Sequence, residues 1–342
     1  MMRKRLIAAV AIILAAAAAI SYSYYTKPVH IIAVGDILLN RGVGEYLEKS
    51  GYDYPYAGIK EEIIKGDIAV ANLECPLTDS GNAVLKRPEL VFKGSKLNGA
   101  ALKGAGFDLL NLANNHTMDQ GREGLTNAIK LLESTGIQIF GAGMTRSEAR
   151  KPVFIDKGRT RIGFLGYSDF PPEGYMYDED KADVARPDMK SLGEEVKTAR
   201  EQCDFLVVSF HWGKEFDSYP GGRQREMAHV AIENGASFII GHHPHVLQSV
   251  EEYKGKLIFY SLGNFVFDRQ LPKGTDESVI IDITVNGGGW KETRIVPVRI
   301  EDCRPVIAQG QAAEFILDKY KACSKNYGVS IDIADGIGYI TH

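Results

Sequence analysis

Short runs of apolar residues alternate with longer amphipathic segments along most of the chain. A short apolar run bounded by turn residues is typical of a strand buried on both faces of a parallel sheet. The amphipathic segments between the runs are typical of helices that connect such strands, so the pattern predicts an α/β protein. Strands are predicted over residues 30–39, 67–73, 107–113, 137–140, 161–167, 204–210 and 236–240, and helices near residues 42–50, 94–104, 122–134, 191–202 and 222–234.

Toward the C-terminus the pattern changes to strands that follow one another directly. Residues 278–285 alternate between apolar and polar side chains, a glycine turn follows at residues 287–289, and residues 293–300 form the next predicted strand. Strands joined this closely are typical of antiparallel hairpins. We therefore expect one domain over residues 29–310, with an antiparallel part packed on the α/β units, and a C-terminal helix with a loose tail over residues 311–342.

The N-terminus has the layout of an export signal. Arg3-Lys4-Arg5 precede an apolar run over residues 6–20, which is short for a bilayer span of about 20 residues. The run reaches that length if it continues through the tyrosine-rich residues 21–25. Such an extension is compatible with a membrane span, since tyrosine rings suit the membrane interface. We expect residues 1–28 to be a signal anchor in the cytoplasmic membrane, with the rest of the chain outside the cytoplasm. A signal peptide cleaved near Ala17-Ala18-Ala19 is the alternative.

Composition and charge further limit the class of protein and its possible partners. A chain of 342 residues with 44% hydrophobic content is long enough to bury one large core. The formal net charge is −4 at pH 7 and nothing in the sequence forms a basic face, which argues against a nucleic-acid partner. The four cysteines lie far apart and form no CxxC pair, which argues against a zinc ribbon. A disulfide between Cys303 and Cys323 and free thiols are both compatible with an exported domain.

Polar and ionisable side chains recur where the predicted strands end. Three histidines lie in Gly241-His242-His243-Pro244-His245, directly after an apolar strand. Because ligands bind at the carboxyl ends of strands in open α/β sheets, we expect these side chains to converge. Taken singly, each is also compatible with a turn former, a helix cap or a solvated loop residue. The residues at strand ends are Asp36, Glu74, Asn115, His116, His211, His243 and His245.

These donors together predict a metal site. Imidazole, carboxylate and amide ligands without a thiolate suit Mn, Fe or Zn better than copper or an iron–sulfur cluster. Two such ions sharing one carboxylate would clamp a phosphoryl group during its displacement. Arg41 follows the first strand and is expected to meet an anionic substrate. Residues 168–187 form a long irregular segment, as lids or substrate walls often do.

Six short motifs stand in order along the chain: Gly35-Asp36, Asn72-Leu73-Glu74, Ala113-Asn114-Asn115-His116, His211-Trp212-Gly213-Lys214-Glu215, Gly241-His242-His243-Pro244-His245 and Tyr260-Ser261-Leu262-Gly263-Asn264-Phe265. This series resembles that of the CapA-type poly-γ-glutamate capsule biosynthesis proteins, which belong to the calcineurin-like metallophosphoesterase superfamily. The resemblance extends over about residues 31–268. It implies a four-layer α/β/β/α sandwich with the site at the strand ends.

The resemblance also implies metal ligands. These are Asp36 and His245 for a first ion, Asn115, His211 and His243 for a second ion, and Glu74 as the carboxylate that bridges the two. Leu38 stands where the superfamily has a further histidine, and Glu74 is longer than the usual aspartate. The implied site therefore holds one or two divalent ions.

A general acid is implied as well. His116 resembles the histidine that protonates the leaving group in the superfamily. The carboxylate that orients this histidine normally follows it directly, but Thr117 occupies that position here, so Asp119 is expected to take the role. Arg41 and Asn264 are assigned to substrate binding.

Two functions are compatible with these features. The favoured one is an anchored, extracytoplasmic component of poly-γ-glutamate or capsule polymer biosynthesis or export. Its expected partners are the cytoplasmic membrane, other capsule synthesis proteins and an acidic polymer. The alternative is a metal-dependent phosphoesterase or hydrolase that acts on a phosphoester or an envelope polymer. The departures at Leu38 and Thr117 leave open whether the chain is an enzyme.

Overall fold

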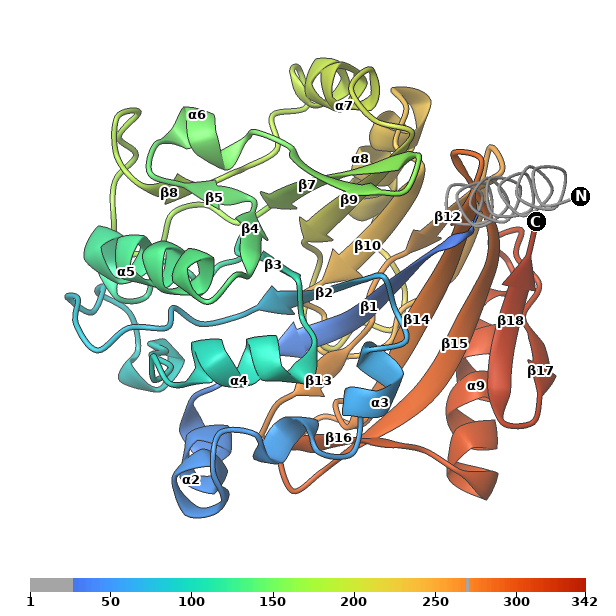
Figure 1. Ribbon diagram of the computed structural model, residues 1–342, viewed down its shortest axis with the longest axis horizontal. Helices are drawn as coiled ribbons and strands as arrows, with labels where there is room; N and C mark the ends of the chain where they lie inside the picture. The colour runs from blue at the N-terminus through green and yellow to red at the C-terminus, as the bar shows by residue number, and fades with distance from the viewer. Residues whose placement is uncertain (1–26, 269–270) are drawn as a thin grey trace, which may run out of the picture.

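The computed structural model describes residues 27–268 and 271–342, which form two β-sheets that face each other (Figure 1). The larger sheet has ten strands. Its main path runs through β17 (Asp332–Ala334), β18 (Ile337–Thr341), β15 (Gly289–Glu301), β14 (Glu277–Asn286), β1 (Val29–Ile37), β2 (Ile68–Leu73), β3 (Leu109–Asn111) and β4 (Gln138–Phe140). Off this path, β13 (Asn264–Val266) pairs with β1, and β16 (Arg304–Ile307) pairs with β15.

The smaller sheet has six strands. They lie in the order β11 (Val250–Tyr253), β12 (Lys256–Phe259), β10 (Phe238–His242), β9 (Phe205–His211), β7 (Thr160–Ser168) and β6 (Val153–Lys157). A separate pair joins β5 (Ala142–Gly143) to β8 (Asp183–Val184).

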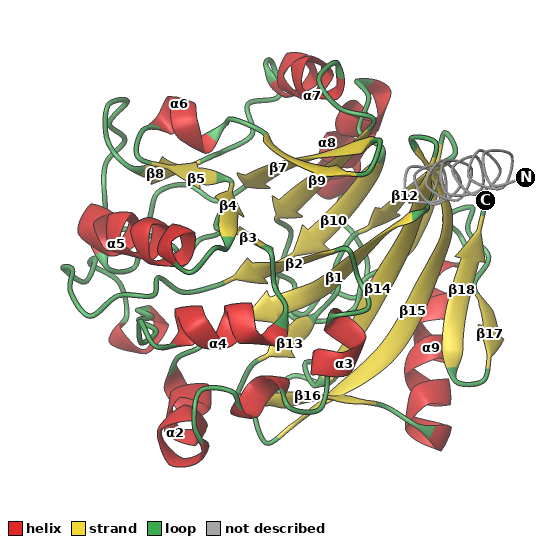
Figure 2. Cartoon of the chain, in the orientation of Figure 1, coloured by secondary structure: helices red, strands yellow, loops and turns green. Residues whose placement is uncertain are grey.

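Helices cover the outer faces of both sheets (Figure 2). The larger sheet packs against α2 (Arg41–Ser50), α3 (Lys60–Ile63), α4 (Asn98–Ala105) and α5 (Gly121–Ser134). The smaller sheet packs against α7 (Leu192–Arg200) and α8 (Gly222–Glu233). The short α6 (Arg146–Ala149) follows β5, and α9 (Gly310–Ser324) packs on β15, β18 and β11. The layers are therefore α/β/β/α, as the resemblance implied.

Alternation along the strands explains why each sheet has two apolar faces. In β1, Ile31 and Ala33 belong to the core between the sheets, whereas Ile32 and Val34 belong to the core under the helices. Successive side chains of a strand point to opposite faces, so a strand covered on both sides is apolar at every position. This is why the buried strands read as continuous apolar runs in the sequence.

The predicted elements are confirmed at β1, β2, β3, β4, β7, β9 and β10 and at α2, α4, α5, α7 and α8. The antiparallel part is also confirmed, because β14 pairs with β15 and β11 with β12 in antiparallel register. The prediction of a loose tail is wrong. Strands β17 and β18 form a hairpin that pairs with β15, and Ile340 is buried in the core between the sheets.

Two further expectations concern the termini and the cysteines. Residues 1–26 of the predicted signal anchor lie outside the described residues. Within residues 27–268 and 271–342, no helix is both long and apolar enough to cross a bilayer. All four cysteines lie in the described part of the chain and none forms a disulfide, including Cys303 and Cys323.

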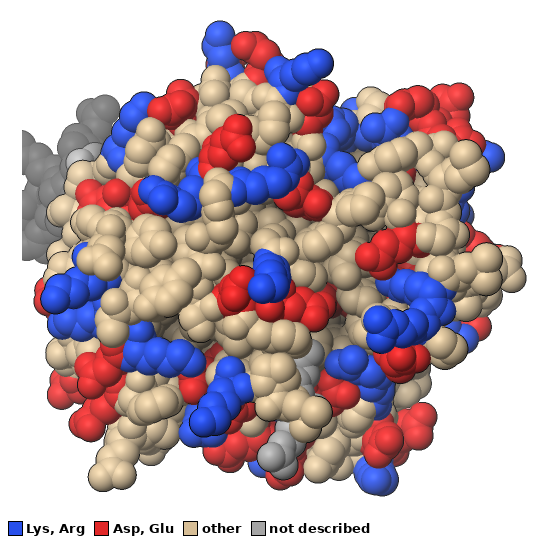
Figure 3. All heavy atoms as spheres, turned by 180° about the vertical axis from the view of Figure 1, so that it is seen from behind, with Lys and Arg blue, Asp and Glu red and all other residues tan. Residues whose placement is uncertain are grey.

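Charged side chains of both signs are interspersed on the face seen in Figure 3. The exposed ion pairs of the described residues include Lys254 with Glu233 and Lys96 with Asp79. That face therefore carries no large patch of a single sign.

Candidate metal centre

The carboxyl ends of β1, β2, β9 and β10 point toward the same side of the molecule (Figure 1). Strands β1 and β2 run parallel with Asp36 beside Asn72, and strands β9 and β10 run parallel with His211 beside His242. Glu74 directly follows β2. The two sheets thus bring side chains from strand ends far apart in the sequence into one buried cluster.

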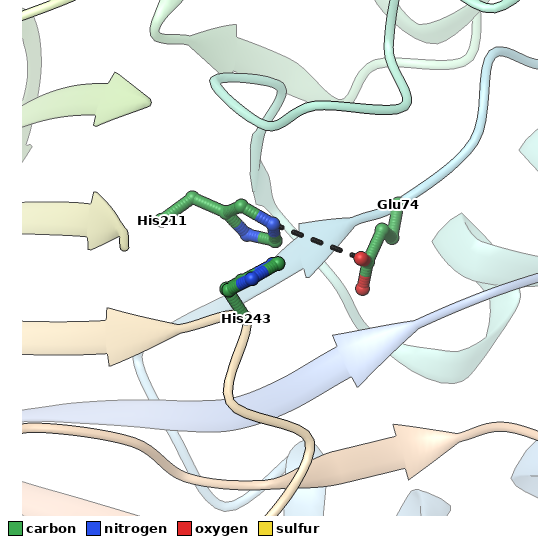
Figure 4. A group of neighbouring side chains, drawn as sticks. All are labelled: Glu74, His211 and His243. Carbon is green, nitrogen blue, oxygen red and sulfur yellow. Dashed lines mark ion pairs between the residues drawn. The ribbon is translucent and has the colours of Figure 1, made fainter. Parts of the chain in front are cut away.

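Glu74 is shared by two groups of possible metal ligands. One group joins Glu74 to His211 and His243, the other joins Glu74 to Asp36 and His245, and within each group the ligand atoms lie within 4.8 Å of one another. The Oε1 atom of Glu74 lies 3.7 Å from Nε2 of His211 (Figure 4) and 3.8 Å from Nε2 of His245. Donor atoms that each lie about 2.0–2.2 Å from one ion are about 3–4 Å apart. The spacing therefore suits coordination better than direct hydrogen bonding.

Unsatisfied polar atoms in the cluster fit a divalent cation. Glu74 is fully buried, and neither of its carboxylate oxygens accepts a hydrogen bond from the described residues. The Nδ1 atom of the buried His243 is likewise without a hydrogen-bond partner there. Burial raises the pKa of Glu74 well above its usual value, and the negative charge of Asp36 adds to the effect. A buried carboxylate in this setting is costly unless a cation compensates its charge.

Asp36 is better satisfied than Glu74. Its Oδ1 accepts a hydrogen bond from Asn72 Nδ2 at 2.8 Å and lies 3.1 Å from Nδ1 of His242, and its Oδ2 accepts one from the His243 amide at 3.1 Å. Burial opposes ionisation of Asp36, but the contacts with His242, His245 and that amide hold its pKa below the usual value. The sequence reasoning assigned no role to Asn72 or His242, although a polar residue inside the apolar β2 was a usable signal.

His211 and His243 are in the neutral form that binds metals. Burial lowers the pKa of His211 well below its usual value and lowers that of His243 to about 3. Neutral imidazole has a lone pair free for coordination. Nε2 of His211 lies 2.9 Å from Oδ1 of Asn115, so the predicted ligand Asn115 also reaches the cluster.

The backbone after β10 is bent to bring its histidines into place. His243 and His245 have φ values of 95° and 58°, in the left-handed region that residues other than glycine rarely adopt. Gly241 is required for a different reason. A Cβ atom there would lie 2.0 Å from the carbonyl oxygen of Tyr260, so the motif needs a glycine where β10 passes this segment.

Asn114 joins two strand ends. Its Nδ2 donates to the carbonyl oxygen of Leu73 at 2.8 Å and to Oδ1 of Asn72 at 3.1 Å. Its Oδ1 accepts from the amides of His116 at 3.0 Å and Thr117 at 2.9 Å. The side chain therefore shapes the turn that presents the candidate general acid, a role compatible with the turn-former alternative.

His116 and Asp119 form the predicted pair. Nδ1 of His116 lies 2.8 Å from Oδ2 of Asp119, which also accepts a hydrogen bond from the Phe92 amide at 2.7 Å. The Phe92 ring stacks on the imidazole at 4.0 Å. Burial lowers the pKa of His116, and the contact with Asp119 acts in the opposite direction. Lys86, which the sequence reasoning missed, lies 2.6 Å from Oδ1 of Asp119 and 3.0 Å from Oε2 of Glu173.

Arg41 lies between two aromatic rings that also contact the candidate site. Its guanidinium is 4.8 Å from the centre of the Phe92 ring and 5.5 Å from that of Phe267, and its Nη2 donates to Oδ1 of Asp268 at 2.5 Å. The Phe267 ring in turn lies 5.0 Å from that of His245. A fixed cation is thus placed beside the donor cluster.

Asn264 is buried behind His245. Its Oδ1 lies 2.8 Å from Nδ1 of that histidine, and its Nδ2 donates to the carbonyl oxygen of Thr275 at 3.0 Å. These contacts make Asn264 a residue that orients His245, which leaves Nε2 of the imidazole for a metal.

Two further residues border the cluster. The half-buried Phe170, in the predicted substrate wall, packs its ring 4.2 Å from that of His243. The exposed Glu215 forms a third group of possible ligands with His243 and His245, again with ligand atoms within 4.8 Å of one another. The sequence reasoning did not single out Glu215, because it lies in a polar loop after β9.

These features define the class as a four-layer α/β sandwich with a buried candidate metal centre at its strand ends. Residues 30–269 match the family described as "Bacterial capsule synthesis protein PGA_cap", and the chain belongs to this family. The resemblance seen in the sequence is thereby confirmed.

Two relatives from Bacillus agree with this assignment. The chain is 33% identical over 273 residues to the "PGA biosynthesis protein CapA" of Bacillus subtilis, an alignment that covers 80% of this chain and 72% of the relative. It is 32% identical over 278 residues to the "Capsule biosynthesis protein CapA" of Bacillus anthracis, with 80% and 67% covered. Among solved structures, the sulfate thiohydrolase SoxB of Thermus thermophilus aligns with a TM-score of 0.45 and 14% identity, covering 86% of this chain and 60% of that one.

Proposed function

We propose that this protein is a membrane-anchored, extracytoplasmic component of the synthesis or export of poly-γ-glutamate or a similar acidic capsule polymer, and that it works with a divalent cation. Family membership and the names of the Bacillus relatives support a role in this process. One observation supports the proposal that a cation is bound. The fully buried Glu74 accepts no hydrogen bond from the described residues, although it lies among metal-binding side chains.

The residues that would hold the cation are Asp36, Glu74, Asn115, His211, His243 and His245. Their mixed oxygen and nitrogen donors suit Mn, Fe or Zn, as one or two ions. When bound, such a cation supplies Lewis acidity toward a substrate oxygen. Arg41, held between Phe92 and Phe267, would bind a negative charge of the substrate beside it.

The chain itself supplies a group for proton transfer. The contact between His116 Nδ1 and Asp119 leaves Nε2 of His116 as the ring nitrogen that can give up or accept a proton. This pairing favours a second candidate function, a metal-dependent hydrolase acting on a phosphoester or an envelope polymer.

Complementation tests the proposed function. In a strain that makes surface poly-γ-glutamate, deletion of the gene for this protein should remove the polymer, and the wild-type gene should restore it. Genes encoding Glu74→Ala or His243→Ala should fail to restore it at equal protein levels. Full restoration by both variants would show that the process does not need the metal centre.

The hydrolase is tested separately. Purified full-length protein with added Mn²⁺ should cleave a generic aryl phosphodiester, and His116→Ala should abolish the cleavage. Absence of Mn²⁺-stimulated cleavage over several phosphoester and amide substrates would leave the non-hydrolytic role in capsule synthesis.

The location is tested by cell fractionation. The full-length protein should remain with the membrane fraction and be accessible to protease added outside the cytoplasmic membrane, whereas a chain lacking residues 1–28 should stay in the cytoplasm. Recovery of full-length protein from the soluble cytoplasm would contradict the proposed anchor.

A further inference from the structure

Among the described residues, one group of possible metal ligands has a member, Glu215, to which the family resemblance assigns no role. It joins Glu215 to His243 and His245, whose ligand atoms and that of Glu215 lie within 4.8 Å of one another. Both histidines also belong to the buried groups that contain Glu74. Glu215 is therefore near the same centre, but on its solvent-exposed side.

The backbone holds the Glu215 loop against the histidine turn. The amide of Phe216 donates a hydrogen bond to the carbonyl oxygen of Pro244 at 2.8 Å, so the residue after Glu215 is bonded to the residue between the two histidines. Phe216 has a φ of 66°, and its ring lies 6.2 Å from that of His245. Each of the two joined segments thus contains a residue with left-handed backbone conformation. Such a conformation costs free energy, so it persists only where the surrounding structure holds it.

Two members of this group lack a partner among the described residues. The Glu215 carboxylate forms no hydrogen bond or ion pair there, and Nδ1 of the buried His243 has no hydrogen-bond partner. The neighbouring acid in the loop behaves differently, since Oδ2 of Asp217 lies 3.5 Å from Nζ of Lys214. Among the described residues, Glu215 thus lies near the histidines without a cation paired to it.

If the centre holds two cations, charge balance also favours a further carboxylate. Among the described residues, the buried groups of possible ligands contain two carboxylates, Asp36 and Glu74, and an imidazole adds no negative charge when it binds a metal. Two divalent cations would carry more positive charge than two carboxylates neutralise, and a buried excess of charge is costly. The position two residues after Asp36 is the apolar Leu38, which supplies no ligand.

We infer that Glu215 is an additional ligand of the metal centre, which coordinates a cation from the solvent side beside His243 and His245. This inference rests on the proposed metal centre. Because Glu215 is exposed and lies on a loop, it is the ligand that can be displaced when a substrate anion approaches, whereas the ligands on the strand ends stay fixed.

Titration of the full-length protein with Mn²⁺ tests the inference. After removal of metals with a chelator, calorimetry should give a dissociation constant for the wild type, and Glu215→Gln should weaken it by at least about tenfold. The amide keeps the size of the side chain but removes its charge. Asp217→Asn, in the same loop, is the matched control and should leave the constant unchanged. Thermal unfolding in chelator should be the same for all three proteins, since both positions are exposed.

The outcomes separate this inference from the proposed function. Unchanged Mn²⁺ binding in Glu215→Gln, or equal weakening by Glu215→Gln and Asp217→Asn, would overturn the role of Glu215. If binding is at the same time lost in Glu74→Ala, the proposed metal centre stands without this ligand. Absence of Mn²⁺ binding in the wild type would overturn both.

Discussion

Glu74 combines complete burial with two carboxylate oxygens that accept no hydrogen bond from the described residues. Asp36, equally buried, is hydrogen-bonded on both oxygens. The pKa values move in opposite directions: burial raises that of Glu74, whereas for Asp36 the contacts with His242, His245 and the His243 amide outweigh burial and lower it. Asp36 is thus a preorganised anion, while Glu74 is an acceptor that needs an external partner.

The substitution Glu74→Gln should stabilise the metal-free protein at neutral pH. Burial raises the pKa of Glu74 in the folded state above its value in the unfolded chain, so its favourable contribution is present below about pH 4.5 and is lost as the pH rises through the folded-state pKa. Replacing the carboxyl group should therefore raise the free energy of unfolding at neutral pH by about 1–3 kcal/mol. Urea unfolding in chelator measures this, and a less stable variant at pH 7 would contradict it.

Lys86→Met should destabilise the protein by about 3 kcal/mol, because it removes the cation beside the buried Asp119. The side chains of this pair are 12% and 1% exposed. The matched control is Lys96→Met, whose pair with Asp79 is 61% and 55% exposed and should contribute less than about 1 kcal/mol. Urea unfolding of both variants compares the two pairs. Equal losses of stability would show that Lys86 has no special role.

Residues on strand ends were predictable and residues from loops were not. Asp36, His211 and His243 each end or follow an apolar run, so the sequence alone indicates that they share one edge of the sheets. Lys86 and Glu215 lie in polar loops, where nearby sequence carries no sign of what they meet. Their partners are set by tertiary contacts that a one-dimensional pattern does not contain.

At the scale of elements, the approach of β10 to the segment after β12 fixes the histidine turn. Gly241→Ala would place a Cβ atom 2.0 Å from the Tyr260 carbonyl oxygen and 2.7 Å from the indole nitrogen of Trp212, which leaves no easy relief. We expect weaker Mn²⁺ binding together with a loss of about 1–3 kcal/mol in stability. Calorimetry and urea unfolding measure the two effects.

Gly44→Ala in α2 is the control for this substitution. Apart from its chain neighbours and the backbone of α2 itself, no atom of the described residues lies within 4 Å of the Cβ position there, so the change should be neutral or slightly stabilising. Normal stability and normal Mn²⁺ affinity in Gly241→Ala would contradict the role given to the close approach.

The C-terminal hairpin is an integral part of the larger sheet. Ile340 in β18 is 2% exposed, and its truncation in Ile340→Ala should cost about 2–4 kcal/mol. Thr341→Ala, at the next and exposed position, should have little effect. Thermal unfolding distinguishes the two, and equal melting temperatures for Ile340→Ala and the wild type would mean that the hairpin is loose after all.

The strands of the C-terminal hairpin were not predicted from the sequence. Asp335-Gly336, with φ values of 51° and 73°, is a turn signal between two short strands. Both strands are short and contain Asp or Gly, so the segment lacks the long apolar run that identified the central strands. Pairing with β15 decides its structure, and that pairing joins residues distant in the sequence.

At the scale of the whole molecule, two sheets must face each other before the site exists. Asp36 and Glu74 come from the larger sheet, whereas His211, His243 and His245 come from the smaller one. The alternation of apolar runs predicts α/β units but does not say how many sheets they form. The family resemblance supplied the layer order, and the inter-sheet core confirms it.

The central claim is that the buried donors hold a divalent cation, and metal analysis of the full-length protein tests it most directly. After dialysis against Mn²⁺ and removal of free ions, elemental analysis by mass spectrometry should find at least one bound cation per chain in the wild type and in the exposed control Glu252→Ala, and none in Glu74→Ala. Absence of bound cation from the wild type, or an equal amount in Glu74→Ala, would contradict the claim.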